Sequence, residues 1–487
     1  MATKQLEIRV TDIVVQIFWN GDDDKDHPLN WKPSHKWRAV IVVSSAVFST
    51  SIASAMVTPN VPAIAETLSI DSKERMQLIY SVFALSYAVG PLIFCPISEQ
   101  LGRYWTITTA MVLFSLGNLV CGLSRSATLL IAARFFSGMG GNGGQSVAIA
   151  VLSDTFSSDD RMKAISVYST FSISGMVIGP ILGAICSEKF HWRTLFHGTS
   201  VLNGIALVIV ATFLPETYPP TLLRREATKI SKIRGGRPPR TQYDVEDSED
   251  LRRTMWHCAR RSVKFLVTQP ILQFIAVYYG LGFGVSFIIF SVFPSIWTEA
   301  YGQTPIKGSL NFIWLGVGCL IPGASIVSAI ESELALSRIE SERRHILKPE
   351  KVFGYMFPAA VFLPLGLFLF GYSVQNKWHP AYVNIGAAFV GFASTIISFA
   401  IFKYLGDAYP LYEASAIAAV QVSRAVTSCT FPVFSRKLFA MMGYDGGTGL
   451  LASIALVLGL VGTSVLVVFG KRLRQKTWRI PLPWTKG

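Results

Sequence analysis

Few residues able to do chemistry lie in or between the apolar stretches of this sequence. Glu99, Gly102 and Arg103 sit in a short polar turn at the end of residues 90–103, GPLIFCPISEQLGR, and the next apolar stretch begins at once. Arg134 and Arg424 lie inside apolar stretches themselves. A carboxylate and a base in one turn can form an ion pair or respond to protonation, and a charge inside an apolar helix normally faces the protein interior.

The composition indicates that membrane-spanning helices hold these residues in place. The chain has 487 residues, of which 51% are hydrophobic and only 15% are charged, whereas a soluble domain has about 25% charged residues. A bilayer-spanning helix needs roughly 20 mostly apolar residues. The sequence predicts twelve such spans, at 38–60, 76–97, 104–123, 128–152, 163–186, 195–214, 268–294, 308–330, 352–372, 381–402, 411–433 and 447–470.

The distribution of basic residues predicts the orientation of these spans. The formal net charge is +14, which could suggest nucleic acid as a partner. Most of the 44 Lys and Arg residues, however, fall in the two tails and in every second loop, as expected for cytoplasmic segments. We therefore expect a multi-pass protein of the cell membrane with both termini cytoplasmic, no nucleic-acid partner and no cleavable signal peptide. The six cysteines show no paired spacing and are expected to be small core residues.

The spans divide into two sets of six. We predict an all-α integral membrane protein with a cytoplasmic tail at 1–37, one six-helix half at 38–214 and a second at 268–470. A cytoplasmic loop at 215–267 joins the halves, and a second cytoplasmic tail covers 471–487.

Polar and aromatic residues within three spans could line a water-accessible cavity. The candidates are hydroxyls in the first span, amides in the fourth and rings in the seventh: Ser49, Ser54, Asn142, Gln145, Tyr279, Phe283, Phe287 and Phe290. Each has an alternative explanation. Hydroxyls in a membrane helix can bond their own backbone or a neighbouring helix, and the aromatic residues can pack against helices or lipid.

Small residues mark two spans as closely packed. Gly138 follows Arg134 by one turn in the fourth span, and Gly175, Gly179 and Gly183 recur at four-residue spacing in the fifth. Glycines at this spacing let another helix approach, and Pro180 can kink the helix that contains it.

Ionisable residues near the inner boundary are the remaining candidates. For a conformational latch we select Glu99, Gly102, Arg103, Asp154, Arg161 and Asp407, and for proton coupling Arg134, Asp154, Glu413 and Arg424. A salt bridge in a solvated loop would explain Asp154 and Arg161 equally well. No carboxylate lies deep in any predicted span.

Several stretches, in their order along the chain, resemble the fungal branch of the major facilitator superfamily, specifically its twelve-span drug:proton antiporters. The resemblance covers about residues 28–475. The matching stretches are HPLNW, GPLIFCPISEQLGR, RFFSGMGG, GMVIGPILGA, LPETYPPTLL, and YLGDAY followed by Arg424 and FPVF. Three departures are visible: Tyr104 replaces the second base of the first signature, the equivalent turn around 330–345 matches poorly, and Ala184 replaces a glycine.

The resemblance implies two pseudo-symmetric six-helix halves with a substrate site between them, near the middle of the membrane. It implies that Glu99, Gly102 and Arg103 form the signature turn, that Arg134 and Gly138 form that of the fourth span, and that the fifth-span glycines and Pro180 form that of antiporters. Glu99 would rest against a helix N-terminus of the other half as a latch, which protonation, or the charges of Asp154 and Arg161, would loosen.

The implied function is export of small amphipathic organic molecules in exchange for protons by alternating access. We expect a monomer that uses the proton gradient and needs no metal or cofactor. A proton-coupled importer of a sugar, a polyamine or another nutrient is the nearest alternative, and a receptor or scaffold without transport is an alternative of another class. An enzyme is not expected, because the sequence shows no Walker loop, metal-ligand cluster or nucleophile with a placed base.

Overall fold

The computed structural model of the chain describes residues 7–11, 14–20, 24–234, 240–241, 243, 251–322, 349–409 and 413–475. Its first six long helices match the first six predicted spans. They are α1 (Pro33–Ala55), α3 (Lys73–Leu101), α4 (Arg103–Leu123), α5 (Ala127–Thr155), α6 (Ser158–Lys189) and α7 (Arg193–Phe213), with the short η2 (Thr58–Asn60) and α2 (Val61–Thr67) after α1.

Local sequence explains where several of these helices begin and end. Ser72 and Ser126 accept hydrogen bonds from the third residue of α3 and α5, which is how a serine caps a helix. Gly102 separates α3 from α4 with φ of 92°, a left-handed value that favours glycine. A single residue therefore makes the sharp reversal between these two helices.

The second half contains α10 (Pro270–Ser295), which continues into a π-helical turn (Ile296–Ala300). The eighth predicted span is represented by α11 (Pro305–Leu310) and a helix over 312–322, and the rest of it lies outside the described residues. The helices that follow are η4 (Pro349–Met356), α13 (Phe357–Gln375), α14 (Pro380–Ala408) and α15 (Glu413–Gln475). Gly443, with φ of 72°, interrupts α15, so α15 contains the last two predicted spans.

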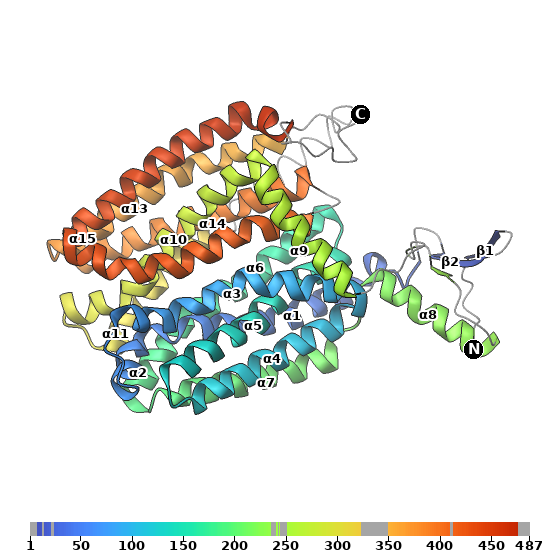
Figure 1. Cartoon of the computed structure of the whole chain (residues 1–487), viewed down its shortest axis with the longest axis horizontal. Helices are drawn as coiled ribbons and strands as arrows, with labels where there is room; N and C mark the ends of the chain where they lie inside the picture. The colour runs from blue at the N-terminus through green and yellow to red at the C-terminus, as the bar shows by residue number, and fades with distance from the viewer. Residues whose placement is uncertain are drawn as a thin grey trace.

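Nine helices of the described part of the chain are long and apolar enough to cross a membrane, and one of them is the double-length α15. Figure 1 shows the long helices in two groups, one with α1, α3, α4, α5 and α7 and the other with α10, α13, α14 and α15. We call the end with α8 and α9 the α9 end, and the opposite end, with α2 and α11, the α2 end.

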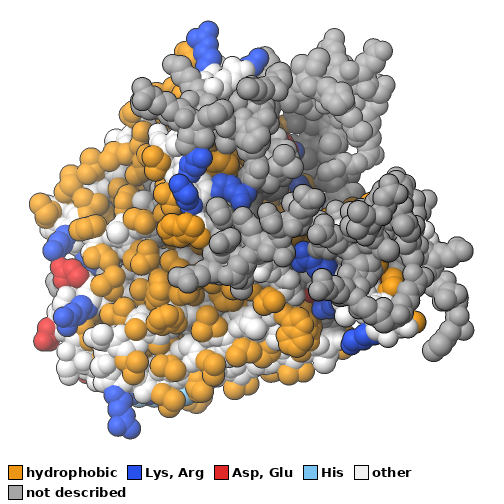
Figure 2. Space-filling model, turned by 45° about the vertical axis from the view of Figure 1, so that its right-hand side comes forward, with side chains coloured by type: hydrophobic (Ala, Val, Ile, Leu, Met, Phe, Trp, Pro, Cys, Tyr) orange, Lys and Arg blue, Asp and Glu red, His pale blue; other side chains and the backbone are white. Residues whose placement is uncertain are grey.

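The surface of the helix groups suits a lipid environment. Figure 2 shows hydrophobic side chains spread over the flank of the molecule. Many large apolar side chains are more than half exposed, among them Leu116, Val201, Val208, Val457 and Val468. A soluble protein would not leave so much apolar surface in water, so this belt faces the bilayer.

The loop between the halves and the N-terminal tail contain structure that the sequence analysis does not predict. The loop forms α8 (Pro219–Arg234), the strand β3 (Arg240–Thr241) and α9 (Leu251–Thr268). In the tail, β1 (Glu7–Thr11) pairs antiparallel with β2 (Val14–Phe18), and β2 pairs parallel with β3. The two tail strands and α8 project together from the α9 end (Figure 1).

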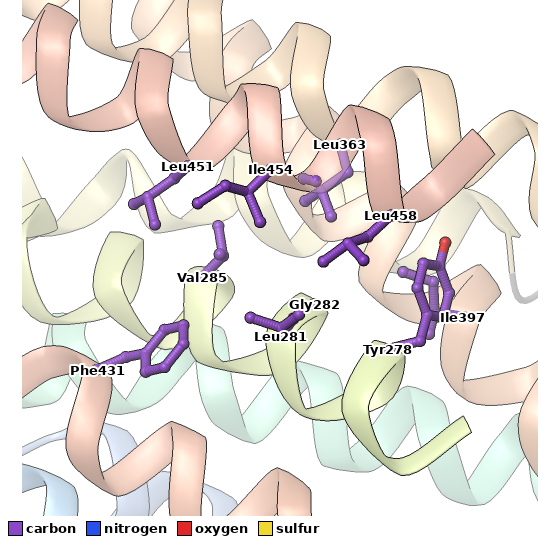
Figure 3. A pocket seen from close by; sticks show the side chains of 11 residues that line it. Tyr278, Leu281, Gly282, Val285, Leu363, Ile397, Phe431, Leu451, Ile454 and Leu458 are labelled. Carbon is purple, nitrogen blue, oxygen red and sulfur yellow. The ribbon is translucent and has the colours of Figure 1, made fainter. Parts of the chain in front are cut away.

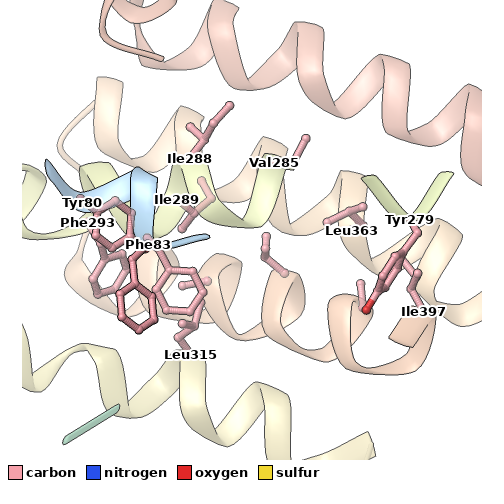
Figure 4. Packing of buried hydrophobic residues seen from close by; sticks show 14 of the residues in the cluster. Tyr80, Phe83, Tyr279, Val285, Ile288, Ile289, Phe293, Leu315, Leu363 and Ile397 are labelled. Carbon is pink, nitrogen blue, oxygen red and sulfur yellow. The ribbon is translucent and has the colours of Figure 1, made fainter. Parts of the chain in front are cut away.

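The apolar core joins the two halves toward the α2 end. One cluster unites side chains of α3, including Tyr80 and Phe83, with side chains of α10, including Ile289 and Phe293, and Figure 4 shows these four close together. A second cluster, which includes Val43, Phe94 and Phe156, contains residues of the first half alone and lies toward the α9 end. The halves therefore share more of their core at the α2 end.

Candidate substrate-binding and gating sites

Arg134 is enclosed within the first half. Its side chain is 0% exposed. Its guanidinium donates to the backbone carbonyls of Ala53 at 3.0 Å, Ile79 at 3.4 Å and Ser54 at 3.5 Å, and it lies 4.6 Å from the ring centre of Phe83. These partners belong to α1 and α3, so Arg134 ties three helices of one half together.

Two predicted cavity residues are buried in contacts between helices instead. Ser49 is 1% exposed and donates to the side-chain oxygen of Asn203 in α7. Asn142 is 1% exposed and donates to Ser86 and to the carbonyl of Phe83 in α3. These partners satisfy a buried hydroxyl and a buried amide, which need hydrogen bonds in the interior of the half.

The glycines of α6 form a close contact with α1. A methyl group on Gly175 would come within 2.7 Å of the Phe48 carbonyl oxygen, and one on Gly179 within 2.8 Å of that of Ile52. Gly183 packs against Met56 in the same way. Gly138 plays a similar part between α5 and α3, where it faces Ser86. Helix α6 continues through Pro180 without interruption.

Arg103 and Asp154 come together at the α9 end. The Arg103 Nε donates to Asp154 Oδ2 at 2.9 Å, and both side chains are largely buried. Arg103 also donates to Ser98 and stacks 4.4 Å over the ring of Tyr218, whose pKa is raised by burial. The pair links α4 to the end of α5, both in the first half, so it braces this half internally.

Glu216 is the centre of this cluster, and the sequence analysis gives it no role. Its carboxylate, with 1% of the side chain exposed, accepts from the backbone N–H of Arg103 at 2.9 Å, of Thr217 at 3.0 Å and of Tyr218 at 3.0 Å, and pairs with Arg225 at 3.7 Å. An acid is favourable at the N-terminus of α4, where the helix has a partial positive charge. The carboxylate fills the space that a side chain at Gly102 would need.

The other predicted latch residues do not form a bond between the halves. Glu99 is exposed, and the nearby charge from outside its own half is Arg261 of α9 rather than a helix N-terminus. Arg161, near the start of α6, forms no ion pair with any described residue. Asp407 pairs at 3.0 Å with Lys403 of its own helix. Glu413 begins α15, and its side chain lies outside those that the structure describes.

Arg424 sits in a cage of rings at the contact between the halves. Its Cζ lies 4.1 Å from the ring centre of Phe283, 4.6 Å from that of Tyr87 and 5.8 Å from that of Tyr279. Its Nη1 donates to Gln421 Oε1 at 3.1 Å and to the Tyr279 hydroxyl at 3.4 Å. Tyr87 belongs to α3 of the first half, and the other members belong to the second.

The remaining predicted cavity residues lie along this contact or near it. Phe287 faces Tyr80 of α3 with ring centres 6.1 Å apart, and Phe290 lies 5.9 Å from Phe287. Ser54 and Gln145 are partly exposed on α1 and α5. Phe283, Tyr87, Gln421 and Arg424 are also partly exposed, whereas Tyr279 is fully buried behind them.

A hollow lies inside the second half, apart from the Arg424 cage. Leu281, Val285, Leu363, Leu451 and Phe431 line it, from α10, α13 and both parts of α15. Figure 3 shows these apolar side chains pointing into the space from opposite sides. Its lining offers almost no polar group to orient a ligand, which distinguishes it from the arginine cage.

Two polar contacts at the surface join the halves at the α2 end, in addition to a buried hydrogen bond of 3.8 Å from Cys429 to Ser81. Lys437 of α15 pairs with Glu74 of α3 at 2.9 Å. The backbone N–H of Ile306, in α11, donates to Glu188 of α6 at 3.0 Å. Both contacts are at the surface, so they hold the halves together weakly.

Sequence reasoning missed Tyr87, Glu216, Gln421 and these contacts at the α2 end. The acid directly after the sixth span, in LPET, is the signal that could have identified Glu216. No group of three metal-ligating side chains occurs within the described ranges.

Comparison with known proteins places this geometry in a family. Residues 43–432 match the model of the Major Facilitator Superfamily. The chain is 32% identical to the efflux pump vrtL of Penicillium aethiopicum, over 94% of this chain and 90% of that protein. It is 31% identical to the efflux pump radE of Floropilus chiversii, over 94% of this chain and 84% of that protein.

Solved structures agree on the fold. The proton:xylose symporter XylE superposes with a TM-score of 0.65 over 91% of this chain and 97% of that one, at 14% identity. The human organic anion transporter MFSD10 does so with a TM-score of 0.58 over 90% of this chain, at 16% identity. Likeness at these identities concerns the fold alone.

The fold and the central site define a secondary transporter of two helical halves. The chain belongs to the Major Facilitator Superfamily, and the predicted resemblance to its fungal members is confirmed by relatives such as vrtL and radE.

Proposed function

We propose that this protein exports small amphipathic organic molecules from the cytoplasm, in exchange for protons. The observation that carries the proposal is the partly exposed group of Phe283, Phe287, Tyr87 and Arg424, to which both halves contribute side chains. A site of apolar rings with a few polar anchors suits such a molecule. The names of the relatives vrtL and radE, both efflux pumps, support export.

The α9 end would face the cytoplasm, with both termini on that side of the cell membrane. Basic residues concentrate in α8 and α9 and in the last turn of α15, and such residues are enriched on the cytoplasmic side of membrane proteins. The shared core at the α2 end then corresponds to closure of the outer side, the state in which a molecule would enter from the cytoplasm.

Proton exchange would rely on the ionisable groups of the first half. Of the two acids selected for proton coupling, Asp154 and Glu413, the structure describes the side chain of Asp154. Its carboxylate pairs with Arg103 at 2.9 Å. Arg134 would contribute by tying α5 to the backbones of α1 and α3, so that a change at one helix moves the others. We expect the monomer to be the working unit.

The test is the accumulation of fluorescent dyes and azoles in cells that lack their own efflux pumps, with and without this protein, at pH 5 and 7.5. Export predicts lower accumulation when the protein is present, and a protonophore should remove the difference. Surface expression is verified by tagging, and Arg134→Ala serves as the inactive control.

Other outcomes separate the alternatives. Higher accumulation under an inward proton gradient would indicate an importer and overturn the proposed direction. Unchanged accumulation of every compound by a surface-expressed protein would favour a receptor or scaffold. Lower accumulation that persists with the protonophore would leave export intact and contradict proton exchange.

A further inference from the structure

We propose that the Arg424 cage binds the carboxylate or phenolate group of an aromatic anion, and that such anions are substrates of the transporter. This inference rests on the proposed export function. The cage consists of Arg424, Gln421, Tyr279, Phe283 and Tyr87, as described above.

The charge of Arg424 has no counter-ion among the described residues, and its Nε is buried without a hydrogen-bond partner. The rings of Phe283 and Tyr87 attract the guanidinium, but cation–π contacts only partly offset the cost of holding a cation at this depth. An anion would supply the missing partner, because the planar guanidinium presents a fork of donors that matches a carboxylate.

Arg134, the other arginine within an apolar span, cannot bind an anion in this way. Arg134 already directs Nε, Nη1 and Nη2 at three backbone carbonyls and is fully enclosed. Arg424 is partly exposed, and its described polar partners are one amide oxygen and one hydroxyl. A ligand can therefore reach Arg424 without breaking the packing of a half.

The position of the cage also suits a substrate. Tyr87 is the midpoint of α3 (Lys73–Leu101). Arg424 lies roughly 16 Å along α15 from the start of that helix at Glu413, because an α-helix rises about 1.5 Å per residue. The cage is thus near the middle of the membrane, where both halves can reach one ligand.

The neighbouring rings determine which anions fit. Phe283 and Phe287 are one helical turn apart on the same face of α10, and both are partly exposed. Phe287 in turn faces Tyr80 of the other half. A planar body could lie along these rings while its anionic group contacts Arg424. The substrate class is therefore an aromatic acid, not a cation or a sugar.

The experiment measures binding to the purified full-length protein in detergent by thermal shift. The probes are 1-naphthoate, 2-naphthoate and 7-methoxycoumarin-3-carboxylate, each with its primary amide, which has the same shape and no charge. The carboxylates should raise the unfolding temperature of the wild type more than the amides do. In Arg424→Gln we expect the affinity for carboxylates to fall at least about tenfold, because a charge-assisted pair is lost.

Two further variants keep the test decisive. Arg424→Lys retains the charge without the fork, and should bind carboxylates more weakly than the wild type and better than Arg424→Gln. Arg125→Gln removes an exposed arginine from the turn between α4 and α5 and should behave as the wild type.

Equal binding of carboxylates by the wild type and Arg424→Gln would overturn the proposal, as would carboxylates that bind no better than their amides. If Arg424→Gln does not fold, the affinity for carboxylates is compared between the wild type and Arg424→Lys, and equal affinities would overturn the proposal. Binding does not depend on transport, so a protein that binds these acids but exports nothing would contradict the proposed function and the role of these acids as substrates, and would leave the assignment of the binding site standing.

Discussion

Contacts within the first half differ in kind from contacts between the halves. Within the half, Arg134 and Glu216 are buried and each is held by several hydrogen bonds. Between the halves, the described polar contacts are an exposed ion pair, one hydrogen bond at the surface and a long Cys429–Ser81 hydrogen bond at 3.8 Å. The rest of this contact is apolar packing, such as that of Tyr80 against Phe287. The first kind holds each charge by directed hydrogen bonds, whereas the second is mainly apolar packing with few polar bonds.

This difference is what alternating access needs. Each half must stay rigid while the two move relative to each other, so strong bonds should lie inside a half and weak ones across the boundary. Arg424 is the exception at the boundary, because its charge lies among rings and has no counter-ion within the described part of the chain. A bound substrate would therefore strengthen the contact between the halves.

The largest effect is expected for Arg134→Ala. The change empties a buried site and leaves the carbonyls of Ala53 and Ile79 without their donor, so α1, α3 and α5 lose a shared anchor. We expect transport to fall at least about tenfold and the unfolding temperature to fall, while the protein still reaches the membrane. Dye efflux measures transport, surface labelling measures arrival at the membrane, and a thermal scan measures the unfolding temperature. Normal efflux by this variant would contradict the claim that buried bonds within a half are needed for transport.

Glu216→Ala should come next. It removes the acceptor of four backbone N–H groups and leaves the half-exposed Arg225 without its partner. Each buried backbone N–H left without an acceptor costs about 1–3 kcal/mol, so we expect a lower unfolding temperature and slower transport. Glu216→Gln, which keeps the shape and one acceptor, should lie between this variant and the wild type.

Gly102→Ala tests the same cluster from the other side. Its methyl group would enter the space of the Glu216 carboxylate, at a residue with φ of 92°. The double variant Gly102→Ala/Glu216→Ala should lose less free energy of unfolding than the two single variants lose in sum, because both changes disturb one contact. Full additivity would show that Gly102 and Glu216 act independently.

Gly179→Leu should have an intermediate effect. The larger side chain would push α6 away from the Ile52 carbonyl of α1, and overpacking typically costs about 1–3 kcal/mol. The neighbouring Ile178 is 37% exposed, so Ile178→Phe is the matched control. We expect a lower unfolding temperature for the glycine variant only; equal shifts for both would contradict the close packing of α6 on α1.

The smallest effect is expected for Glu74→Gln, which breaks the exposed pair with Lys437 at the α2 end. Exposed ion pairs are worth about 0–1 kcal/mol, so the unfolding temperature should stay unchanged and the transport rate should change by less than about fivefold. A loss of transport as large as that of Arg134→Ala would mean that the contacts between the halves are not weak.

The sequence predicts the parts of this molecule that depend on local pattern. Apolar runs predict the spans, and the four-residue spacing of Gly175, Gly179 and Gly183 predicts a close-packed face. The helices α8 and α9 escape prediction because they lie outside the apolar runs, and a short amphipathic helix has no equally strong signal.

The direction of side chains inside the bundle could not be predicted in the same way. Ser49 and Asn142 face Asn203 and Ser86, partners that are distant in sequence and depend on how the helices rotate. Glu216 caps a helix that begins 113 residues earlier. Tyr87 is one of many aromatic residues in the spans, and only the packing of α3 against α10 and α15 brings it to Arg424.

The most direct test of the account is a cross-link between the halves at the α2 end. Cysteines replace Glu74 and Lys437, whose side chains meet at 2.9 Å, in a background without native cysteines. A short reducible bifunctional thiol reagent joins them, and dye efflux is measured before and after. We predict that cross-linking stops efflux, that reduction restores it, and that the single-cysteine variants are unaffected. Continued efflux by fully cross-linked protein would contradict movement of the two halves at this end.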